Sequence, residues 1–295
     1  MRIDVLDVCI ALNVTRIWMI TSSKLRIRSS RKNSVLMPLK KVYARSAVQN
    51  SSMSGKSDFM RLDSLSSVQF KEAMTKKPVI LLPIGATEAH GGHLPLCTDS
   101  VQPEYVADKV AELIGGLVAP PIRYAHHSST KNMPGTISIS FLTTMHLAID
   151  VLNSLIDNGA DKIVIVSGHA GSSHLNALRQ GCAEVAEKRD VKIMLLSDYD
   201  LVDEFPIDQR GDGHGGKVET SRVMHICPDL ARKAPCRGDY VSCGYLIVSD
   251  PERCMPKGYV GDAQDATKEL GEQINEFVVS RLVEEIKKSF GGFYE

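Results

Sequence analysis

The stretch that decides the fold is "KPVILLPIGATEAHGGHLPLCTDS", residues 77–100. Its first part, "KPVILLPIGA", is a continuous apolar run that ends near a glycine, which predicts a buried strand of the parallel type. Its second part holds Glu88, His90, His93 and Asp99 within a dozen positions. Two interpretations follow from these residues alone: a metal-binding loop, or a polar turn after a strand with its side chains in water.

The spacing of the acidic and histidine residues is compatible with metal binding. Glu88 and His90 are separated by one residue, so an extended backbone directs both side chains to the same side. Carboxylate and imidazole together suit a transition metal such as zinc, manganese or iron. With further carboxylates and histidines from elsewhere, such a loop holds a pair of ions that one carboxylate bridges.

Strand and helix patterns alternate after this stretch. Further strands are predicted at 117–124, 161–169 and 191–200, and amphipathic helices at 103–116, 143–160, 172–190, 217–226 and 262–290. Ser172 or Ser173 is expected to cap the helix at 172–190. Strands and helices at this spacing predict an α/β fold, in which one domain forms a three-layer sandwich around a largely parallel central sheet.

Polar clusters follow each predicted strand. They are the loop of Glu88 to Asp99, "YAHHSSTKNMPGT" (124–136), "SGHAGSSH" (167–174) and "DGHGGKVETS" (212–221). Ligand sites of open parallel sheets form at the carboxyl ends of the strands, so we expect one shared site. His169 is a candidate ligand there, and His214 is a candidate acid/base group because imidazole titrates near neutral pH.

Each of these clusters also has an interpretation in which its residues neither bind a ligand nor take part in catalysis. His169 could cap the next helix, and Glu219 could be an acidic residue that the helix dipole favours in a first turn. "SGHAGSSH" is a weak candidate for a phosphate cradle because it lacks the usual glycine spacing. His174 reads as structural or solvent-facing. His126, His127 and Lys131 read as parts of an ordinary polar loop.

Composition limits the class of protein. The chain has 295 residues, 43% hydrophobic residues and zero formal net charge, which suits one large core or two domains and predicts no nucleic-acid partner. No apolar run is long enough to predict a membrane span. The seven cysteines are odd in number and show no CxxC spacing, so we expect reduced thiols in a cytoplasmic compartment rather than a disulfide framework or a zinc ribbon.

Residues 1–58 differ from the rest of the chain, because they are rich in serine and basic residues and poor in acidic ones. An organelle transit peptide has this composition, and so does an upstream stretch included before a true start at Met53 or Met60. Either interpretation predicts poor order for 1–58 and one globular domain over 59–295.

The motifs together resemble the creatininase family of metal-dependent amidohydrolases. "PIGATEAHGGHLPLCTD" (83–99) matches the family pattern P-x-G-x-x-E-x-H-G-x-H-L-P-x-x-T-D at nearly every fixed position. "PGTIS" (134–138), "SGHAGS" (167–172) and "HGGKVETS" (214–221) match further family stretches. The resemblance runs from about residue 62 to about 285. It implies the family's α/β sandwich, assembly as a homohexamer and two divalent ions per subunit, which would be zinc, iron or manganese.

The resemblance also implies roles for single residues. Glu88, His90, Asp99 and His169 would be metal ligands, with Asp99 bridging, and Glu219 would be a further ligand or would support one. His214 would be the catalytic acid/base, and His93 would orient a ligand carboxylate. The implied reaction is the hydrolysis of a C–N amide bond in a small cyclic amide or formamide.

Departures from the family pattern bear on the substrate. Creatinine-hydrolysing members have a glutamate where this chain has Gly171, and they cover the substrate with tryptophans, whereas the single Trp18 lies outside the domain. The motifs are more similar to the branch of the archaeal deformylase that acts on a formylamino-pyrimidine ribonucleotide in riboflavin and deazaflavin biosynthesis. The phosphate of such a substrate would lie near Lys131 or the serines of the second motif, and Lys131, Ser172 and Lys217 are predicted to bind the substrate.

Three alternatives remain open from the sequence. Two are enzymes of the same family, a creatinine amidohydrolase and an amidohydrolase that cleaves a lactam or a peptide. The third is a non-catalytic nucleotide-binding protein on the same fold, which the intact set of candidate ligands disfavours.

Overall fold

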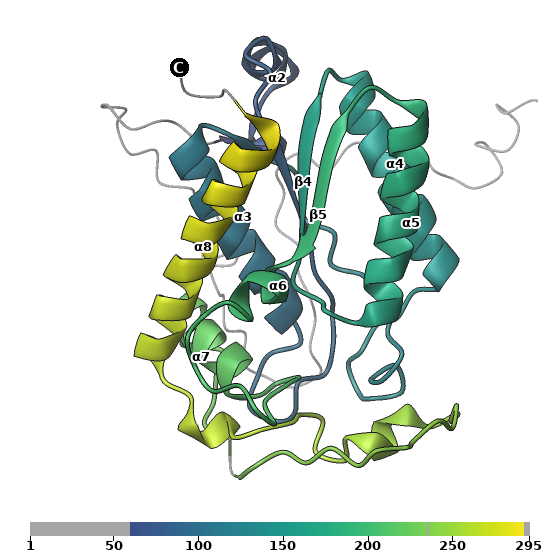
Figure 1. Ribbon diagram of the computed structural model, residues 1–295, viewed down its shortest axis with the longest axis vertical. Coiled ribbons are helices and arrows are strands. Elements are labelled where there is room, and N and C mark those ends of the chain that lie inside the picture. Colours follow the sequence, from purple (N-terminus) through teal and green to yellow (C-terminus); the bar gives the residue numbers. More distant parts are fainter. Residues whose placement is uncertain (1–59, 235, 292–295) are drawn as a thin grey trace, which may run out of the picture. The chain divides into compact units, whose positions relative to one another are not determined.

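The computed structural model describes residues 60–234 and 236–291 (Figure 1). The predicted extension, residues 1–58, lies outside the described residues, so its two interpretations stay predictions. The same holds for the proposed domain start at residue 59. None of the described helices is long and apolar enough to cross a membrane.

A five-stranded parallel sheet forms the centre of the described chain. Its strand order is β1-β3-β2-β4-β5, and every neighbouring pair is parallel. The strands are β1 (Met60–Arg61), β2 (Ile80–Ile84), β3 (Leu117–Val118), β4 (Lys162–Ser167) and β5 (Lys192–Ser197). The structure thus confirms the α/β class with a parallel sheet, and adds the short edge strand β1, which the sequence patterns did not predict.

Helices cover both faces of this sheet (Figure 1). On one side lie α4 (Phe141–Asp157) and α5 (Ser172–Lys188), and on the other lie α3 (Thr98–Ile114), α7 (Lys217–Ile226) and α8 (Lys268–Phe290). Ile80, Leu82 and Ile84 of β2 belong to the apolar cluster that includes α4 and α5, whereas Leu81 belongs to the cluster of α3 and α8. Alternate residues of a strand face opposite sides, so both faces of β2 are buried, as its continuous apolar run predicts.

Several predicted element ends differ from the observed ones. The strand predicted at 117–124 ends at Val118, because Pro120 and Pro121 have no N–H with which to continue the ladder. The strand predicted at 191–200 gives way after Ser197 to α6 (Asp198–Val202), which the Ser197 side chain caps. Gly171 stands at the N-cap of α5 without a side-chain bond, so the predicted serine cap is wrong.

The remaining differences concern helix starts. Helix α3 begins at Thr98, earlier than predicted, and α8 begins at Lys268, later than predicted, where Thr267 caps it. Helix α2 (Ser67–Met74) was not predicted, although Ser66 and Gln69 form a capping box there. Short 3-10 turns occupy Leu62–Ser64, Pro251–Cys254 and Ala263–Asp265.

Candidate metal centre

Five acidic and histidine side chains meet at the carboxyl ends of β2 and β4. Glu88 and His90 follow β2, Asp99 lies in the first turn of α3, His169 follows β4, and Glu219 lies in the first turn of α7. The structure therefore brings together all the residues that the family resemblance implied as metal ligands.

Asp99 lies at the middle of this cluster. Its Oδ1 is 2.8 Å from Nε2 of His90, and its Oδ2 is 2.9 Å from Nδ1 of His169. Glu219 Oε2 lies 3.3 Å from the same nitrogen of His90, and Glu88 Oε2 lies 2.8 Å from the same nitrogen of His169. The cluster thus consists of two half-sites that share the carboxylate of Asp99.

Two glycines allow Asp99 to reach this position. A Cβ atom on Gly85, just after β2, would lie 2.5 Å from the carbonyl oxygen of Asp99, and one on Gly168, just after β4, would lie 2.1 Å from it. Both distances are far below van der Waals contact, so only glycine lets the first turn of α3 approach the two strand ends this closely. The glycines on either side of Asp99 are therefore a geometric requirement of the centre.

The centre concentrates negative charge away from water. Glu88 and Asp99 are each 2% exposed and Glu219 is 7% exposed, so three carboxylates are buried side by side. Buried charges are stable only when opposite charges compensate them. In the metal-free protein the histidines provide that compensation.

The pKa values reflect this pairing. Burial alone would lower the pKa of His169, but Glu88 and Asp99 outweigh it and raise that pKa to about 10. Burial would also lower the pKa of His90, but Asp99 and Glu219 outweigh it and raise that pKa well above its usual value. Burial would raise the pKa of Glu219, yet the charge of His90 holds it at about 2.

The donor set fits divalent metal ions. Three groups of side chains have donor atoms within 4.8 Å of one another: His90, Asp99 and Glu219; Glu88, His90 and His214; and Glu88, His127 and His169. Oxygen and imidazole nitrogen donors of this kind suit zinc, manganese and iron. Oε2 of Glu88 and Nε2 of His90 are buried, and each lies within ion-pairing distance of another donor of the centre, as expected of atoms that could share a cation.

His214 lies beside this centre rather than inside a half-site. Its ring stacks on that of His90, with the ring centroids 4.0 Å apart, and its Nε2 lies 2.7 Å from the carbonyl oxygen of Ala89. A carbonyl only accepts hydrogen bonds, so Nε2 carries a hydrogen and Nδ1 is the nitrogen free to exchange a proton. His214 also lines the cavity described below.

The position of His93 differs from the expected one. Its Nε2 lies 2.9 Å from the carbonyl oxygen of Gly215 and 3.1 Å from the hydroxyl of Thr220, so it does not bond a ligand carboxylate. The N–H of Gly215 in turn donates to Glu219 over 2.6 Å. His93 therefore holds the loop between His214 and Glu219, and acts on the centre through the backbone.

Sequence reasoning missed two residues of the centre. His127 was assigned to an ordinary polar loop, but it is buried with its Nε2 3.7 Å from Oε2 of Glu88. The hydroxyl of Thr130, from the same loop, donates to the other oxygen of Glu88. His174 is also fully buried, with its ring against that of His169, so it is not solvent-facing. The adjacent histidines of "AHH" were the available signal, but spacing alone did not show which one points inward.

A cavity of about 700 Å³ opens onto the centre. Glu88, Asp99, His169, His214 and Glu219 line it, and so do the acidic residues Asp203 and Asp212. Among residues 60–234 and 236–291, no lysine or arginine lines it. Lys131, Ser172 and Lys217 do not line this cavity, and their contact with the substrate stays a prediction. Residues 128–130 supply polar groups instead.

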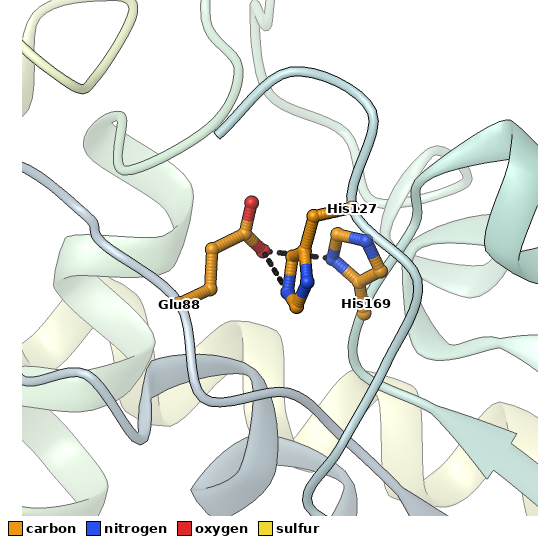
Figure 2. A group of neighbouring side chains, drawn as sticks. All are labelled: Glu88, His127 and His169. Atoms are coloured by element: carbon orange, nitrogen blue, oxygen red, sulfur yellow. Dashed lines mark ion pairs between the residues drawn. The ribbon is translucent and has the colours of Figure 1, made fainter. Parts of the chain in front are cut away.

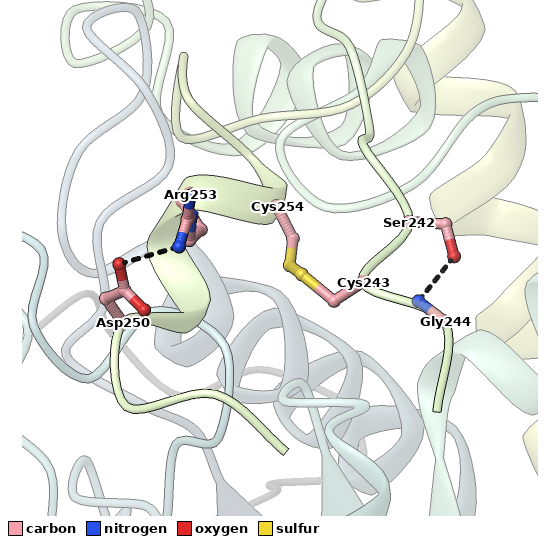
Figure 3. Close-up of a disulfide and its surroundings, with 6 residues drawn as sticks. All are labelled: Ser242, Cys243, Gly244, Asp250, Arg253 and Cys254. Atoms are coloured by element: carbon pink, nitrogen blue, oxygen red, sulfur yellow. Dashed lines mark hydrogen bonds and ion pairs between the residues drawn. A yellow bond between two sulfur atoms is a disulfide. The ribbon is translucent and has the colours of Figure 1, made fainter. Parts of the chain in front are cut away.

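A disulfide, drawn in Figure 3, lies among the residues that line this cavity. Cys243 and Cys254 are bonded to each other, and both line the cavity. The expectation of reduced cysteines is therefore wrong for this pair. The sequence test looked for close CxxC spacing, whereas these cysteines are 11 residues apart and meet because the 3-10 turn at 251–254 brings the chain back. Tyr240, Leu246 and Ile247, which also line the cavity, are largely exposed.

Comparison with known proteins agrees with this geometry. The profile of one protein family, described as creatininase (creatinine amidohydrolase), matches residues 63–286. A creatinine amidohydrolase from Pseudomonas putida is 30% identical over 236 residues, which cover 72% of this chain and 90% of that protein. A mycofactocin precursor peptide peptidase from Mycolicibacterium smegmatis is 31% identical over 230 residues, covering 72% of this chain and 85% of the relative.

A solved structure described as creatininase with Mn has the same fold. It superposes with a TM-score of 0.70 at 26% identity and covers 80% of this chain and 100% of its own. The family profile spans most of the described residues, and all of the motifs that build the centre lie inside it. The chain therefore belongs to the creatininase family.

Proposed function

We propose that this creatininase-family amidohydrolase uses two divalent metal ions to hydrolyse a C–N amide bond in a small cyclic amide or formamide. The observation that carries the proposal is the pair of half-sites that share Asp99. One ion would be held by His90, Asp99 and Glu219, and the other by Glu88, His169 and Asp99. Zinc, manganese and iron all suit these donors, and a similar solved creatininase is named for Mn.

Such ions, when bound, supply the Lewis acidity that activates water and polarises the amide carbonyl. The other steps belong to the chain's own residues. His214 has its Nε2 hydrogen committed to Ala89, so Nδ1 would accept a proton from the attacking water and pass it to the leaving nitrogen. The stack on His90 keeps this ring beside the metal-binding residues and directs it into the cavity.

The cavity bears on the class of substrate. Its described lining has several carboxylates and no lysine or arginine, which favours a neutral or cationic amide over a phosphorylated one. The formylamino-pyrimidine ribonucleotide deformylase proposed from the motifs would need a phosphate contact that Lys131, Ser172 and Lys217 do not provide at this cavity. An uncharged cyclic amide or formamide is therefore the better-supported substrate.

A substrate panel tests the proposal. The purified protein, loaded with Zn²⁺ or Mn²⁺, would be incubated with creatinine, with a short formamide, with a lactam and with a formylamino-pyrimidine nucleotide. We expect turnover of at least one unphosphorylated amide, its loss on chelation and its return when the metal is added back. Turnover of the nucleotide alone would contradict the substrate class, and turnover that survives exhaustive chelation would contradict the metal dependence.

A binding protein without catalysis is the alternative from another class. It would retain a ligand in the cavity without converting it, and isothermal titration with the same panel would detect this. The three buried carboxylates of the centre disfavour it, because a pocket that only binds a neutral molecule has no need of them. Assembly as a homohexamer and a cytoplasmic location remain predictions.

A further inference from the structure

His127 is a buried histidine without a hydrogen-bond partner. Only 1% of the residue is exposed, and neither ring nitrogen has a partner within the described chain. Leaving a buried polar group unpaired costs free energy, so native proteins rarely do it without a reason. A cation that the ring is built to bind would be such a reason.

The surroundings of His127 are those of a metal ligand. Its Nε2 lies 3.7 Å from Oε2 of Glu88, and the same oxygen lies 2.8 Å from Nδ1 of His169 (Figure 2). The two histidine rings lie 4.8 Å apart by their centroids, and both sit beside the carboxylate of Glu88 (Figure 2). The donor atoms of all three residues fall within 4.8 Å of one another.

The separation of His127 from Glu88 matches the size of a shared ion. Protein nitrogen and oxygen donors lie about 2.0–2.2 Å from zinc, so two donors of one ion are separated by roughly 3–4 Å. The 3.7 Å between His127 and Glu88 lies within that range and is too long for a hydrogen bond.

The loop that carries His127 also fixes Glu88 for this purpose. The hydroxyl of Thr130 donates to Oε1 of Glu88, which leaves Oε2 directed at the two histidines. The loop itself is held to the metal-binding stretch because the N–H of Ala89 donates to the hydroxyl of Thr136. One loop therefore supplies both a candidate donor and the bond that orients its neighbour.

We propose that His127 is a direct ligand of the ion held by Glu88, His169 and Asp99. This inference rests on the proposed two-metal function and adds an asymmetry to it. One ion would have four protein ligands, a closed set of the kind seen in structural sites, whereas the ion of His90, Asp99 and Glu219 would have three and keep an open position. The open ion is the one beside His214, since His214 stacks on His90.

Metal affinity in matched variants tests the assignment. His127→Leu removes the donor and keeps an apolar ring-sized volume, and His126→Leu changes the neighbouring residue, whose Nδ1 bonds the carbonyl of Ile139 instead. Each full-length protein would be titrated with Zn²⁺ against a competing chelator, with the bound metal counted by mass spectrometry. We expect His127→Leu to weaken one of two ions by about tenfold to a hundredfold or more, and His126→Leu to leave both unchanged.

A second measurement separates ligation from a packing role. Replacing an unpartnered buried ring with leucine should not lower the melting temperature of the metal-free protein, while the rise in melting temperature on adding Zn²⁺ should shrink. A metal-free His127→Leu protein that melts well below the wild type would assign His127 a packing role and overturn the proposal.

The remaining outcomes are distinguishable. If the wild type binds two ions and His127→Leu binds them equally tightly, the assignment of His127 is wrong and the two-metal function stands. If His127→Leu keeps both affinities but loses turnover, His127 acts on the substrate and not on the metal. If the wild type binds no divalent ion, the proposed function fails together with the inference.

Discussion

The ring of His214 stacks on the ring of His90 at 4.0 Å between centroids. The contact joins the loop before α7 to the loop after β2, and the bond from His214 to Ala89 spans 125 residues of sequence. It places a histidine that can exchange protons directly beside one that faces two carboxylates. In the proposed function the ring of His90 binds metal and the ring of His214 transfers protons, and the stacking contact holds the two rings side by side.

Loss of the His214 ring should separate catalysis from metal binding. We expect His214→Ala to keep two ions per chain and to lose turnover by about a hundredfold to ten-thousandfold, the usual contribution of a general acid or base. Metal analysis and steady-state kinetics on the same preparation check this. Loss of an ion in His214→Ala would instead make His214 a ligand, as one of the candidate donor groups allows.

The shared carboxylate predicts a difference between Asp99 and Glu219. Asp99→Asn should weaken both ions, because both half-sites use that carboxylate, whereas Glu219→Gln should weaken only the ion at His90. Binding isotherms with Zn²⁺ or Mn²⁺ give the number and affinity of the sites in each variant. Selective loss of one ion in Asp99→Asn would show that the carboxylate does not bridge.

The stability of the metal-free protein should fall as the pH rises. The pKa of His169 is raised to about 10 from an unfolded value of about 6.5, and that of His90 is also raised. A raised pKa contributes stability that is complete below about pH 6.5 and is lost as the pH approaches 10. Urea unfolding in the presence of chelator should show a decline of several kcal/mol across that window.

Two controls belong to that experiment. A His90→Gln/His169→Gln protein should show a much flatter pH dependence, because the two raised groups are gone. The metal-loaded wild type should not show the decline, since ions then compensate the carboxylates in place of protons. Equal slopes for the wild type and the double variant would mean that other groups govern the pH dependence.

A buried ion pair below the centre should matter for stability. Arg222 and Asp198 lie 2.7 Å apart with both side chains fully buried, and Arg222 also donates to Asn275 of α8. Arg222→Met should destabilise the fold by about 3–5 kcal/mol, because Asp198 is left as an uncompensated buried charge. Lys188→Met, which breaks an exposed pair with Glu184, should cost less than about 1 kcal/mol by the same unfolding measurement.

Reduction of the disulfide should affect substrate binding more than chemistry. Cys243 and Cys254 line the cavity, and neither belongs to a group of candidate metal donors among the described residues. We expect Cys243→Ser/Cys254→Ser to raise KM several-fold and to leave metal content and kcat near wild-type values. Cys227→Ser, at a free cysteine, is the matched control. A loss of kcat with unchanged KM would place the disulfide in the catalytic step.

The sequence predicted most of the centre because its parts follow strands. Glu88 and His169 come directly after buried apolar runs, and parallel strands bring their carboxyl ends to one edge of a sheet. Apolar periodicity is a local property, so the positions of β2, β4 and α7 could be read without any knowledge of tertiary contacts. The predicted starts of α3 and α8 were less accurate than the strand positions. Capping and packing together decide where a helix begins, and these two helices begin at Thr98 and Lys268.

The predictions that failed or stay open concern residues whose environment depends on loop paths. Lys131 and Lys217 were predicted to contact the substrate, and because neither lines the cavity, this role stays a prediction. Cys243 and Cys254 have no diagnostic spacing, and their pairing depends on how the 240–255 segment turns back. Loop direction follows from contacts between residues distant in sequence, which periodicity does not encode.

By itself, the sequence determined the parallel α/β fold and the strand that Glu88 and His90 follow, because burial patterns are local, and its resemblance to a family implied the candidate ligand set. Only the tertiary structure decided that Asp99 lies between His90 and His169, that Glu219 completes one half-site, and that His127 turns inward beside Glu88. The physical reason is close packing. Gly85 and Gly168 allow the first turn of α3 to lie close to the ends of β2 and β4. This close approach decides which donor atoms come near the carboxylate of Asp99.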